Sequence, residues 1–256
     1  MAERLTLNKN RTLQADCFLM NRSVQMVKIK LFLLLLFTAA LGLAQKTDST
    51  ALAVERYTFN PGKVYIPAVA MTAGILFDAA RPEISTIGDY RGSDIFGFGN
   101  HLDDYAQFAP LFALYGFEIA GMKPRTDWQD RTAILIKGQA LNLGMVYILK
   151  KTLKKPRPDG SGYSFPSGHT ANAFAGATML SIEYGESLRW VPYASYALAA
   201  GIGLMRMDNQ KHYFSDVLFG AGIGVLSVKM AYWTHQYKWN KSRSLKDPFT
   251  NVYRLH

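Results

Sequence analysis

Six apolar segments of helical length account for most of the chain after residue 63. Each runs for more than twelve residues and lacks the strict alternation of apolar and polar residues that marks a strand. Proline and glycine lie in the gaps, and neither an internal repeat nor a long linker divides the series. The pattern therefore predicts an all-α fold, a single bundle of about six helices. The segments lie at about 64–80, 104–122, 131–149, 170–184, 190–205 and 214–233.

A targeting signal precedes the bundle. Met26 to Lys30 form a short basic segment, and the apolar run LFLLLLFTAALGLA follows it, with small residues at a spacing that suits cleavage. We therefore predict a secretory signal peptide; an uncleaved membrane anchor is the alternative, although 14 apolar residues are fewer than the ~20 that span a bilayer. The expected organisation is a non-structured extension that could be a start-site artefact (1–25), the signal peptide (26–44), a polar lead-in (45–63), the helical domain (64–235) and a basic tail (236–256).

The net charge of +10 is spread over the chain, with +4 in residues 1–44 and +6 in the remainder. Such a balance suits an anionic substrate or an anionic lipid surface. A nucleic-acid partner is not predicted, because the chain has no basic strand interleaved with aromatic residues and no recognition-helix pattern. The one cysteine, Cys17, precedes the signal, so the exported chain is expected to have no disulfide and no cysteine-ligated metal.

The sequence leaves two ways to place the bundle relative to a membrane. Its segments are short for spans, and Glu118, Lys137, Glu183 and Lys229 put charges inside them, which a bilayer tolerates only at interior positions. The run VLFGAGIGVLSV, in contrast, has the small residues that membrane helices use to pack. We expect five spans, with the polar loops facing the periplasm and the basic tail inside. A fully soluble periplasmic bundle is the alternative.

The string RMDNQKHYFSD pairs a histidine with a carboxylate. His212 and Asp216 are four residues apart, so at a helix start they lie on one face within contact distance. A carboxylate there fixes the tautomer of the imidazole and leaves its other nitrogen free to attack. In isolation the pair would read as a solvated helix cap.

The string Pro166-Ser-Gly-His169 opens the next apolar segment. Backbone N–H groups at a helix N-terminus favour an anion, Gly168 permits close approach of the backbone, and Ser167 adds a hydroxyl donor. His169 is then placed to give or take a proton at a bound phosphate. Alone, the string would read as a turn with a surface histidine.

The basic run KKTLKKPRP contains Lys150 and, seven residues later, Arg157. Such a run is usually a solvated face, but Pro156 and Pro158 stiffen the arginine between them. Arginine offers paired donors that match phosphate oxygens, and lysine offers a point charge. With Arg206, these cations could neutralise the charge of a transferring phosphoryl group.

Taken together, the three strings resemble the motifs of the type 2 phosphatidic acid phosphatase family in its bacterial membrane-associated branch, which shares its fold with vanadium haloperoxidases. That family has Lys, six residues, Arg-Pro; then Pro-Ser-Gly-His; then Ser-Arg, five residues, His, three residues, Asp. This chain matches every position and spacing except that Met205 replaces the serine, which removes a minor polar support. The resemblance covers roughly residues 64–235.

The resemblance implies a division of roles among these residues. His212 would attack phosphorus to form a phosphohistidine, Asp216 would orient it, and His169 would protonate the leaving oxygen and later activate water. Neither a metal nor another cofactor is implied. Phosphate binding would fall to Lys150, Arg157, Ser167, Gly168 and Arg206.

The predicted function is hydrolysis of a lipid-linked phosphate monoester or pyrophosphate at the outer face of a bacterial inner membrane. Phosphatidic acid, phosphatidylglycerol phosphate, polyprenyl pyrophosphate and the phosphates of lipid A are all candidate substrates, and no protein partner is evident. The alternatives are a soluble periplasmic acid phosphatase, a vanadium-dependent haloperoxidase in which His212 would ligate the metal, and a non-catalytic membrane relative.

Polar residues outside the three strings receive structural interpretations. Asp103 and Asp104 are expected to cap the helix that follows them. His101, His235 and His256 have no partner at a useful spacing and are expected to be surface groups.

Overall fold

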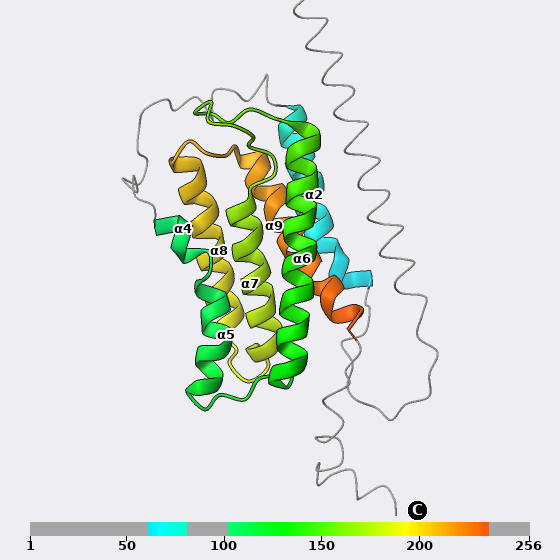
Figure 1. Cartoon of the computed structure of the whole chain (residues 1–256), viewed down its shortest axis with the longest axis vertical. Coiled ribbons are helices and arrows are strands. Elements are labelled where there is room, and N and C mark those ends of the chain that lie inside the picture. Colours follow the sequence, from blue (N-terminus) through cyan, green and yellow to red (C-terminus); the bar gives the residue numbers. More distant parts are fainter. Residues whose placement is uncertain (1–60, 81–101, 236–256) are drawn as a thin grey trace, which may run out of the picture. The chain divides into compact units, whose positions relative to one another are not determined.

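The computed structural model describes residues 61–80 and 102–235. Every regular element in these ranges is a helix, which confirms the all-α prediction (Figure 1). The predicted extension, the signal peptide, nearly all of the lead-in and the basic tail lie outside them. The elements are η1 (Pro61–Val64), α2 (Tyr65–Ala79), α4 (Leu102–Ala106), α5 (Ala109–Ile119), α6 (Trp128–Leu153), α7 (Gly168–Tyr184), α8 (Val191–Asp208) and α9 (Phe214–Trp233).

The predicted segment 104–122 is two helices rather than one. Pro110 lies in the first turn of α5. In a continuous helix its ring would clash with the carbonyl of Ala106, four residues earlier, so α4 ends there. The side chain of Gln107 donates to the carbonyl of Asp104 over 2.8 Å and closes the end of α4.

Helix α6 is longer at both ends than its apolar run. Asp127 adopts an extended conformation before the first turn, and that turn is polar, so hydrophobicity alone does not detect it. At the other end Lys154 adopts a left-handed conformation (φ 48°) and donates its backbone N–H to the carbonyl of Lys150. This left-handed cap ends the helix and redirects the chain into the loop that follows.

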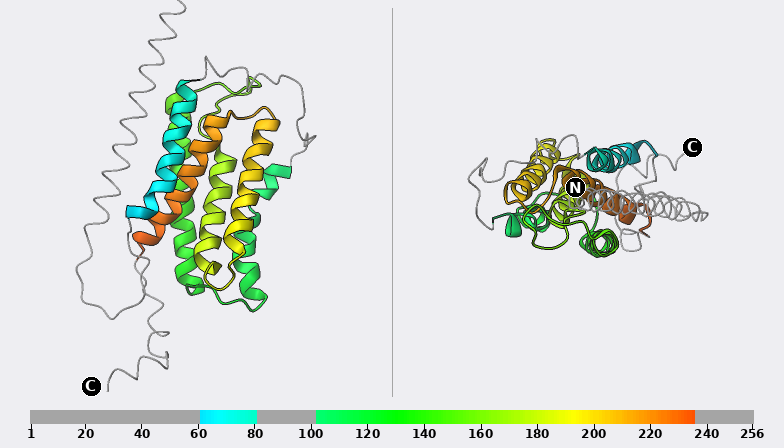
Figure 2. Two further views of the ribbon diagram at one scale, coloured as in Figure 1. Left: turned by 180° about the vertical axis from the view of Figure 1, so that it is seen from behind. Right: turned by 90° about the horizontal axis from the view of Figure 1, so that it is seen from above.

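Helices α7 and α9 form the centre of the bundle and pack against each other, with α2 and α6 against α9 and α5 and α8 against α7 (Figures 1 and 2). Helix α7 is rich in small residues whose side chains are fully buried. Sixteen of the 20 residues of α9 are buried. The other helices of the described part therefore pack around this central pair.

Glycines let the neighbours of α9 approach its backbone. An ideal Cβ at Gly220 would lie 2.6 Å from the carbonyl oxygen of Ser167, and one at Gly224 would lie 2.2 Å from that of Ala171. On another side, a Cβ at Gly222 would meet Met71 of α2 at 2.4 Å. No side chain larger than hydrogen fits these contacts without movement of a neighbour.

The end of the bundle that holds the C-termini of α7 and α9 contains a buried polar cluster. Glu183 accepts hydrogen bonds from the backbone N–H and the hydroxyl of Thr126, each over 2.9 Å, and from the hydroxyl of Tyr232. His235 lies against Asp130 at 2.8 Å, and its side chain is only 7% exposed. The prediction that His235 is a surface group is therefore wrong, because its partner is 105 residues away in sequence.

Large apolar side chains lie on the outer faces of several helices. Ile136, Leu143 and Tyr147 of α6 are each at least 60% exposed, and similar residues lie on α2 and α8. By length and composition, α6 and α9 could each cross a bilayer, although most of α9 is buried inside the bundle. The expected number of spans stays a prediction.

Candidate active site

The loop between α6 and α7 carries two of the predicted cations. Pro156 and Tyr163 pair as an isolated antiparallel bridge. The backbone N–H of Arg157 donates to the carbonyl of Gly162 over 3.0 Å. Gly162 has a φ of 114°, a conformation that favours glycine, and it allows the loop to fold back on itself.

The folded loop brings Lys150 and Arg157 together. The ammonium of Lys150 donates to the carbonyl of Tyr163 over 3.3 Å, and the Nε of Arg157 donates to the same carbonyl over 3.2 Å. Lys150 also lies within electrostatic range of Arg206 and Asp216. The folded loop therefore holds two of the predicted phosphate-binding cations on one carbonyl.

Helix α7 begins at Gly168, as the motif predicts. Ser167 is fully buried just before it, and its hydroxyl lies 2.8 Å from that of Thr170. The backbone N–H of Ser167 donates to the carbonyl of Asp216 over 3.0 Å, which ties this turn to the start of α9. The free N–H groups of the first turn of α7 are suited to an anion.

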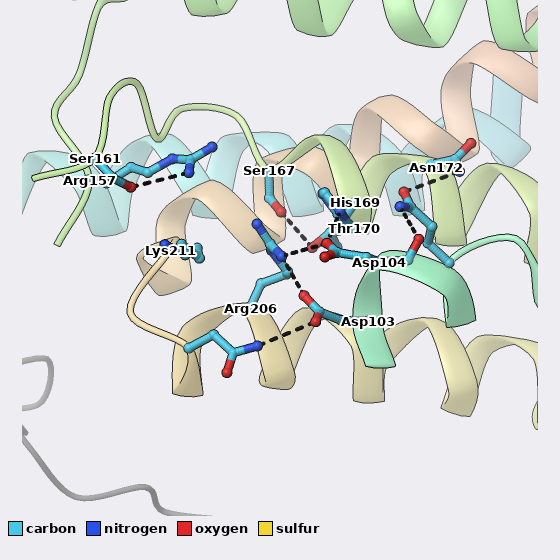
Figure 3. Close-up of polar contacts among 12 residues, drawn as sticks. Asp103, Asp104, Arg157, Ser161, Ser167, His169, Thr170, Asn172, Arg206 and Lys211 are labelled. Carbon is cyan, nitrogen blue, oxygen red and sulfur yellow. Dashed lines mark hydrogen bonds and ion pairs between the residues drawn. The ribbon is translucent and has the colours of Figure 1, made fainter. Parts of the chain in front are cut away.

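Arg206 lies in the last turn of α8 with its side chain only 8% exposed. Its guanidinium donates to the carboxylate of Asp103 and lies 3.4 Å from that of Asp104 (Figure 3). Asn209 donates to Asp103 as well, over 3.3 Å. The prediction that Asp103 and Asp104 cap a helix is therefore wrong: their side chains hold a cation about one hundred residues further along the chain.

His169 shares one of these carboxylates. His169 is the second residue of α7, and its Nε2 lies 2.8 Å from Oδ1 of Asp104 (Figure 3). Asp104 thus lies between the imidazole and the guanidinium of Arg206, and it fixes the orientation of the histidine. Through Asp104, the imidazole at the start of α7 lies close to the guanidinium at the end of α8.

His212 lies in the turn between α8 and α9, and its backbone N–H donates to the carbonyl of Arg206 over 3.2 Å. Its Nδ1 is 3.7 Å from Oδ2 of Asp216, which is a contact but longer than a hydrogen bond. Oδ2 accepts the backbone N–H of Tyr213 over 2.9 Å, so Asp216 also caps α9. In this conformation Nδ1 is buried without a hydrogen-bond partner among the described residues.

The surroundings of His212 favour a neutral imidazole. Burial lowers the pKa of His212 to about 4, and the charges of Lys150 and Arg206 act in the same direction. The negative charge of Asp216 opposes this lowering of the pKa. At neutral pH the ring is therefore uncharged and has a lone pair available for attack.

A cation that the sequence analysis did not single out lies behind Asp216. Lys155 contacts Oδ1 of Asp216 and lies 2.6 Å from Oδ1 of Asp78, which comes from α2. Its place in a run of basic residues concealed it, and Asp78 is 77 residues earlier in the chain. Only the folded structure pairs them.

All eight predicted site residues lie at the same end of the bundle, around the start of α7 and the turn before α9. They come from α6, the loop after it, and helices α7 to α9. Among the described residues, no group of three or more His, Asp or Glu side chains is arranged to hold a metal ion. Three cations, helix N–H groups and two imidazoles are chemically suited to bind an oxyanion and to supply a nucleophile and a proton carrier beside it.

Comparison with known sequences finds a match to one family over part of the chain. Residues 131–240 match the PAP2 superfamily, and this stretch contains all three motifs.

Two curated proteins are similar in sequence. Lipid A 1-phosphatase of Porphyromonas gingivalis is 38% identical over 149 residues, which are 57% of this chain and 34% of that protein. A probable diacylglycerol pyrophosphate phosphatase 1 of Schizosaccharomyces pombe is 26% identical, over 49% of this chain and 60% of that protein. The chain thus aligns with about a third of the first protein and three-fifths of the second.

Two solved structures align with part of this chain. The crystal structure of Aquifex aeolicus LpxE aligns with a TM-score of 0.46 and 27% identity, over 60% of this chain and 93% of that one. The structure of the first transmembrane PAP2 type phosphatidylglycerolphosphate phosphatase from Bacillus subtilis aligns with a TM-score of 0.47 and 22% identity, over 65% of this chain and 94% of that one.

Proposed function

We propose that this chain is a membrane phosphatase that hydrolyses a lipid-linked phosphate monoester or pyrophosphate through a phosphohistidine. The observation that carries the proposal is the placement of the buried His212 beside Asp216, whose carbonyl is hydrogen-bonded to the turn before α7, with Lys150 and Arg206 within electrostatic range. These groups can bind a phosphate and attack it at the same place. The names of the two similar curated proteins, both phosphatases of phosphorylated lipids, support the same reaction.

In the first step His212 attacks phosphorus. Lys150, Arg157, Arg206, the hydroxyl of Ser167 and the backbone N–H of Gly168 bind the non-bridging oxygens. With its proton on Nδ1, facing Asp216, the imidazole uses the lone pair of Nε2 to form the N–P bond. The bond from phosphorus to the leaving oxygen breaks, and protonated His169 gives its proton to that oxygen.

In the second step water hydrolyses the phosphohistidine. His169, now neutral, takes a proton from the water as its oxygen attacks phosphorus. The N–P bond breaks, inorganic phosphate leaves, and His212 returns to its neutral state. Asp103 holds Arg206 in place through an ion pair, and Asp104 holds His169 in place, in both steps.

A lipid substrate is proposed because the outside of the bundle is apolar. Exposed residues such as Ile136, Leu143 and Tyr147 follow one face of α6 at spacings of seven and four residues, and α2 and α8 carry others. A soluble bundle would expose this much apolar surface only at an interface. We propose a bilayer as that interface, with the site at the periplasmic face of the inner membrane, as the signal sequence and the basic tail predict.

The test compares the wild-type protein with His212→Ala on a total bacterial membrane-lipid extract. Phosphate release by the wild type alone supports the proposal, and mass analysis of the lipids identifies which one lost phosphate. Release only from a small soluble phosphomonoester would contradict the lipid substrate. Equal release by both proteins would contradict the role of His212.

The phosphohistidine is tested separately. Loss of a general acid typically costs ~10²–10⁴-fold in rate, and in His169→Ala the base that activates water is missing as well. A phosphoenzyme should therefore persist in this variant after reaction with a phosphate-labelled substrate and a rapid alkaline quench. Labelled protein that survives base and loses its label in acid indicates a phosphohistidine. Release of the leaving group by His169→Ala without any label on the protein would contradict the covalent step.

A further inference from the structure

We infer that Lys155 is a positioning residue: together with Asp78 it holds the Asp216 carboxylate in place behind His212. This inference rests on the proposed function and adds two residues to its machinery. Lys155 is not one of the motif positions, and Asp78 lies outside the region that matches the PAP2 superfamily. Both are assigned here from their contacts.

The ammonium of Lys155 is surrounded by acceptors from two helices. It contacts Oδ1 of Asp216 and the hydroxyl of Ser215 at 3.1 Å on α9, and Oδ1 of Asp78 at 2.6 Å on α2. Aromatic rings close two further sides, with the Tyr213 centroid at 4.8 Å and the Phe165 centroid at 5.3 Å. The side chain is 13% exposed.

These contacts argue against a role for Lys155 as a phosphate ligand. An ammonium has three donors and no acceptor. Asp216, Asp78 and Ser215 provide one acceptor for each donor, so no N–H remains for a substrate oxygen. Lys150 differs, because its ammonium donates one long hydrogen bond to the carbonyl of Tyr163 at 3.3 Å, which leaves donors for phosphate.

The partner that benefits is Asp216, whose side chain is fully buried. A buried carboxylate without a cation beside it tends to take up a proton. A protonated Asp216 would no longer present a negative charge to His212, and its Oδ2 would no longer stabilise the imidazolium that forms as the N–P bond is made. Lys155 thus preserves the charge of Asp216 on the side away from His212.

Asp78 fixes the position of the ammonium from the opposite direction. Its Oδ1 lies 2.6 Å from the Nζ of Lys155 and accepts the hydroxyl of Ser215 over 3.3 Å. The backbone of Lys155 is held too, since its carbonyl accepts the N–H of Ser164 over 2.7 Å. Helix α2 is therefore linked to the catalytic histidine through the series Asp78, Lys155, Asp216 and His212.

The test uses three substitutions and one control in the full-length protein. Lys155→Met removes the charge, Lys155→Arg retains it, and Asp78→Asn removes the second anchor. The control, Lys154→Met, removes an exposed cation one residue earlier. Each protein is assayed for kcat and KM on the lipid that loses phosphate in the membrane-lipid extract, for competitive inhibition by inorganic phosphate, and for its thermal unfolding midpoint.

A positioning role predicts a fall in kcat with little change in phosphate binding. Lys155→Met should lose about 100-fold in kcat, since a misplacement of about 1 Å can cost that much, while the inhibition constant of inorganic phosphate stays within about threefold. Lys155→Arg should recover to within about tenfold of the wild type, and Asp78→Asn should fall between them. Lys154→Met should retain wild-type kcat.

Two results would overturn the inference. Wild-type kcat in folded Lys155→Met would show that Asp216 needs no such support. A parallel loss of kcat and of affinity for inorganic phosphate would show that Lys155 binds the substrate. If Lys155→Met does not fold, Lys155→Arg and Asp78→Asn decide, and wild-type kcat in Asp78→Asn removes Asp78 from the proposal. Failure of the proposed function is distinct, because the wild type would then release no more phosphate than His212→Ala.

Discussion

Replacing Gly220 by alanine should damage the active site more than it damages the fold. Gly220 lies in α9 directly under the turn that precedes α7, and an added Cβ would lie 2.6 Å from the carbonyl oxygen of Ser167. That oxygen belongs to backbone, so it cannot rotate away as the end of a flexible side chain can. The same turn presents the backbone N–H groups that are proposed to bind phosphate.

The magnitude follows from this distance. Ordinary contact begins at 3.4 Å, so the turn and α9 must separate by 0.8 Å. Overpacking of this kind costs about 1–3 kcal/mol, while alanine gains about 1 kcal/mol over glycine in a helix interior. The free energy of unfolding should therefore fall by no more than about 2 kcal/mol. A displacement close to 1 Å, in contrast, lowers kcat by about 10- to 100-fold.

The assay measures kcat on a phosphorylated lipid and the thermal unfolding midpoint of the same purified protein. Gly144→Ala is the matched control, because a Cβ there meets nothing within 4 Å. It should gain up to about 1 kcal/mol in stability and keep its kcat. Wild-type kcat in Gly220→Ala, or equal losses in both variants, would refute the argument that α9 sets the position of this turn.

Three further predictions concern other parts of the protein. The rate constant kcat/KM should fall on the acidic side near pH 4, because His212 must be neutral to attack and its pKa is lowered to about 4. The profile is first corrected for ionisation of the substrate phosphate near pH ~6. A fall near pH 6.5 would contradict this prediction. Asp103→Asn should lower the free energy of unfolding by roughly 3 kcal/mol in chemical denaturation, because it removes one partner of a buried ion pair; an unchanged midpoint would show that Asn209 and Asp104 compensate. Glu183→Ala should lower the free energy of unfolding by roughly 2–4 kcal/mol, because it leaves its hydrogen-bond partners unsatisfied. It should leave kcat unchanged, since about 22 Å of helix α7 separates Glu183 from the site. A loss of kcat at a temperature where the protein is folded would contradict this prediction.

The sequence predicted the helices well where hydrophobicity determines them. Helices α7 and α9 are buried on nearly all sides, so their apolar runs coincide with their full length. The prediction was less accurate for α6, whose first turn is polar, and for the segment 104–122, where Pro110 ends one helix and starts another. Apolar runs report burial, whereas helix ends depend on caps and on steric contacts within a few residues.

The sequence also identified the groups that the fold brings together, because the spacing within each motif is local. It could not identify Asp103 and Asp104, which are isolated polar residues until α8 places Arg206 beside them. Lys155 was hidden among other basic residues, although it alone in that run is shown to contact Asp216. Pairings across about 60 to 140 residues are set by helix packing, which no spacing rule within one motif contains.

The carboxylates around the site limit how far the chain could be shortened. The stretch that matches the PAP2 superfamily starts at residue 131, and every motif residue lies inside it. Asp78, Asp103 and Asp104, however, come from α2 and α4, ahead of that boundary. A protein trimmed to residue 131 would keep each phosphate ligand and both histidines, yet Lys155 would lose one of its two carboxylate partners, and Arg206 and His169 would lose theirs. A shortened protein that keeps these contacts must therefore include α2 and α4 as well as the matched stretch.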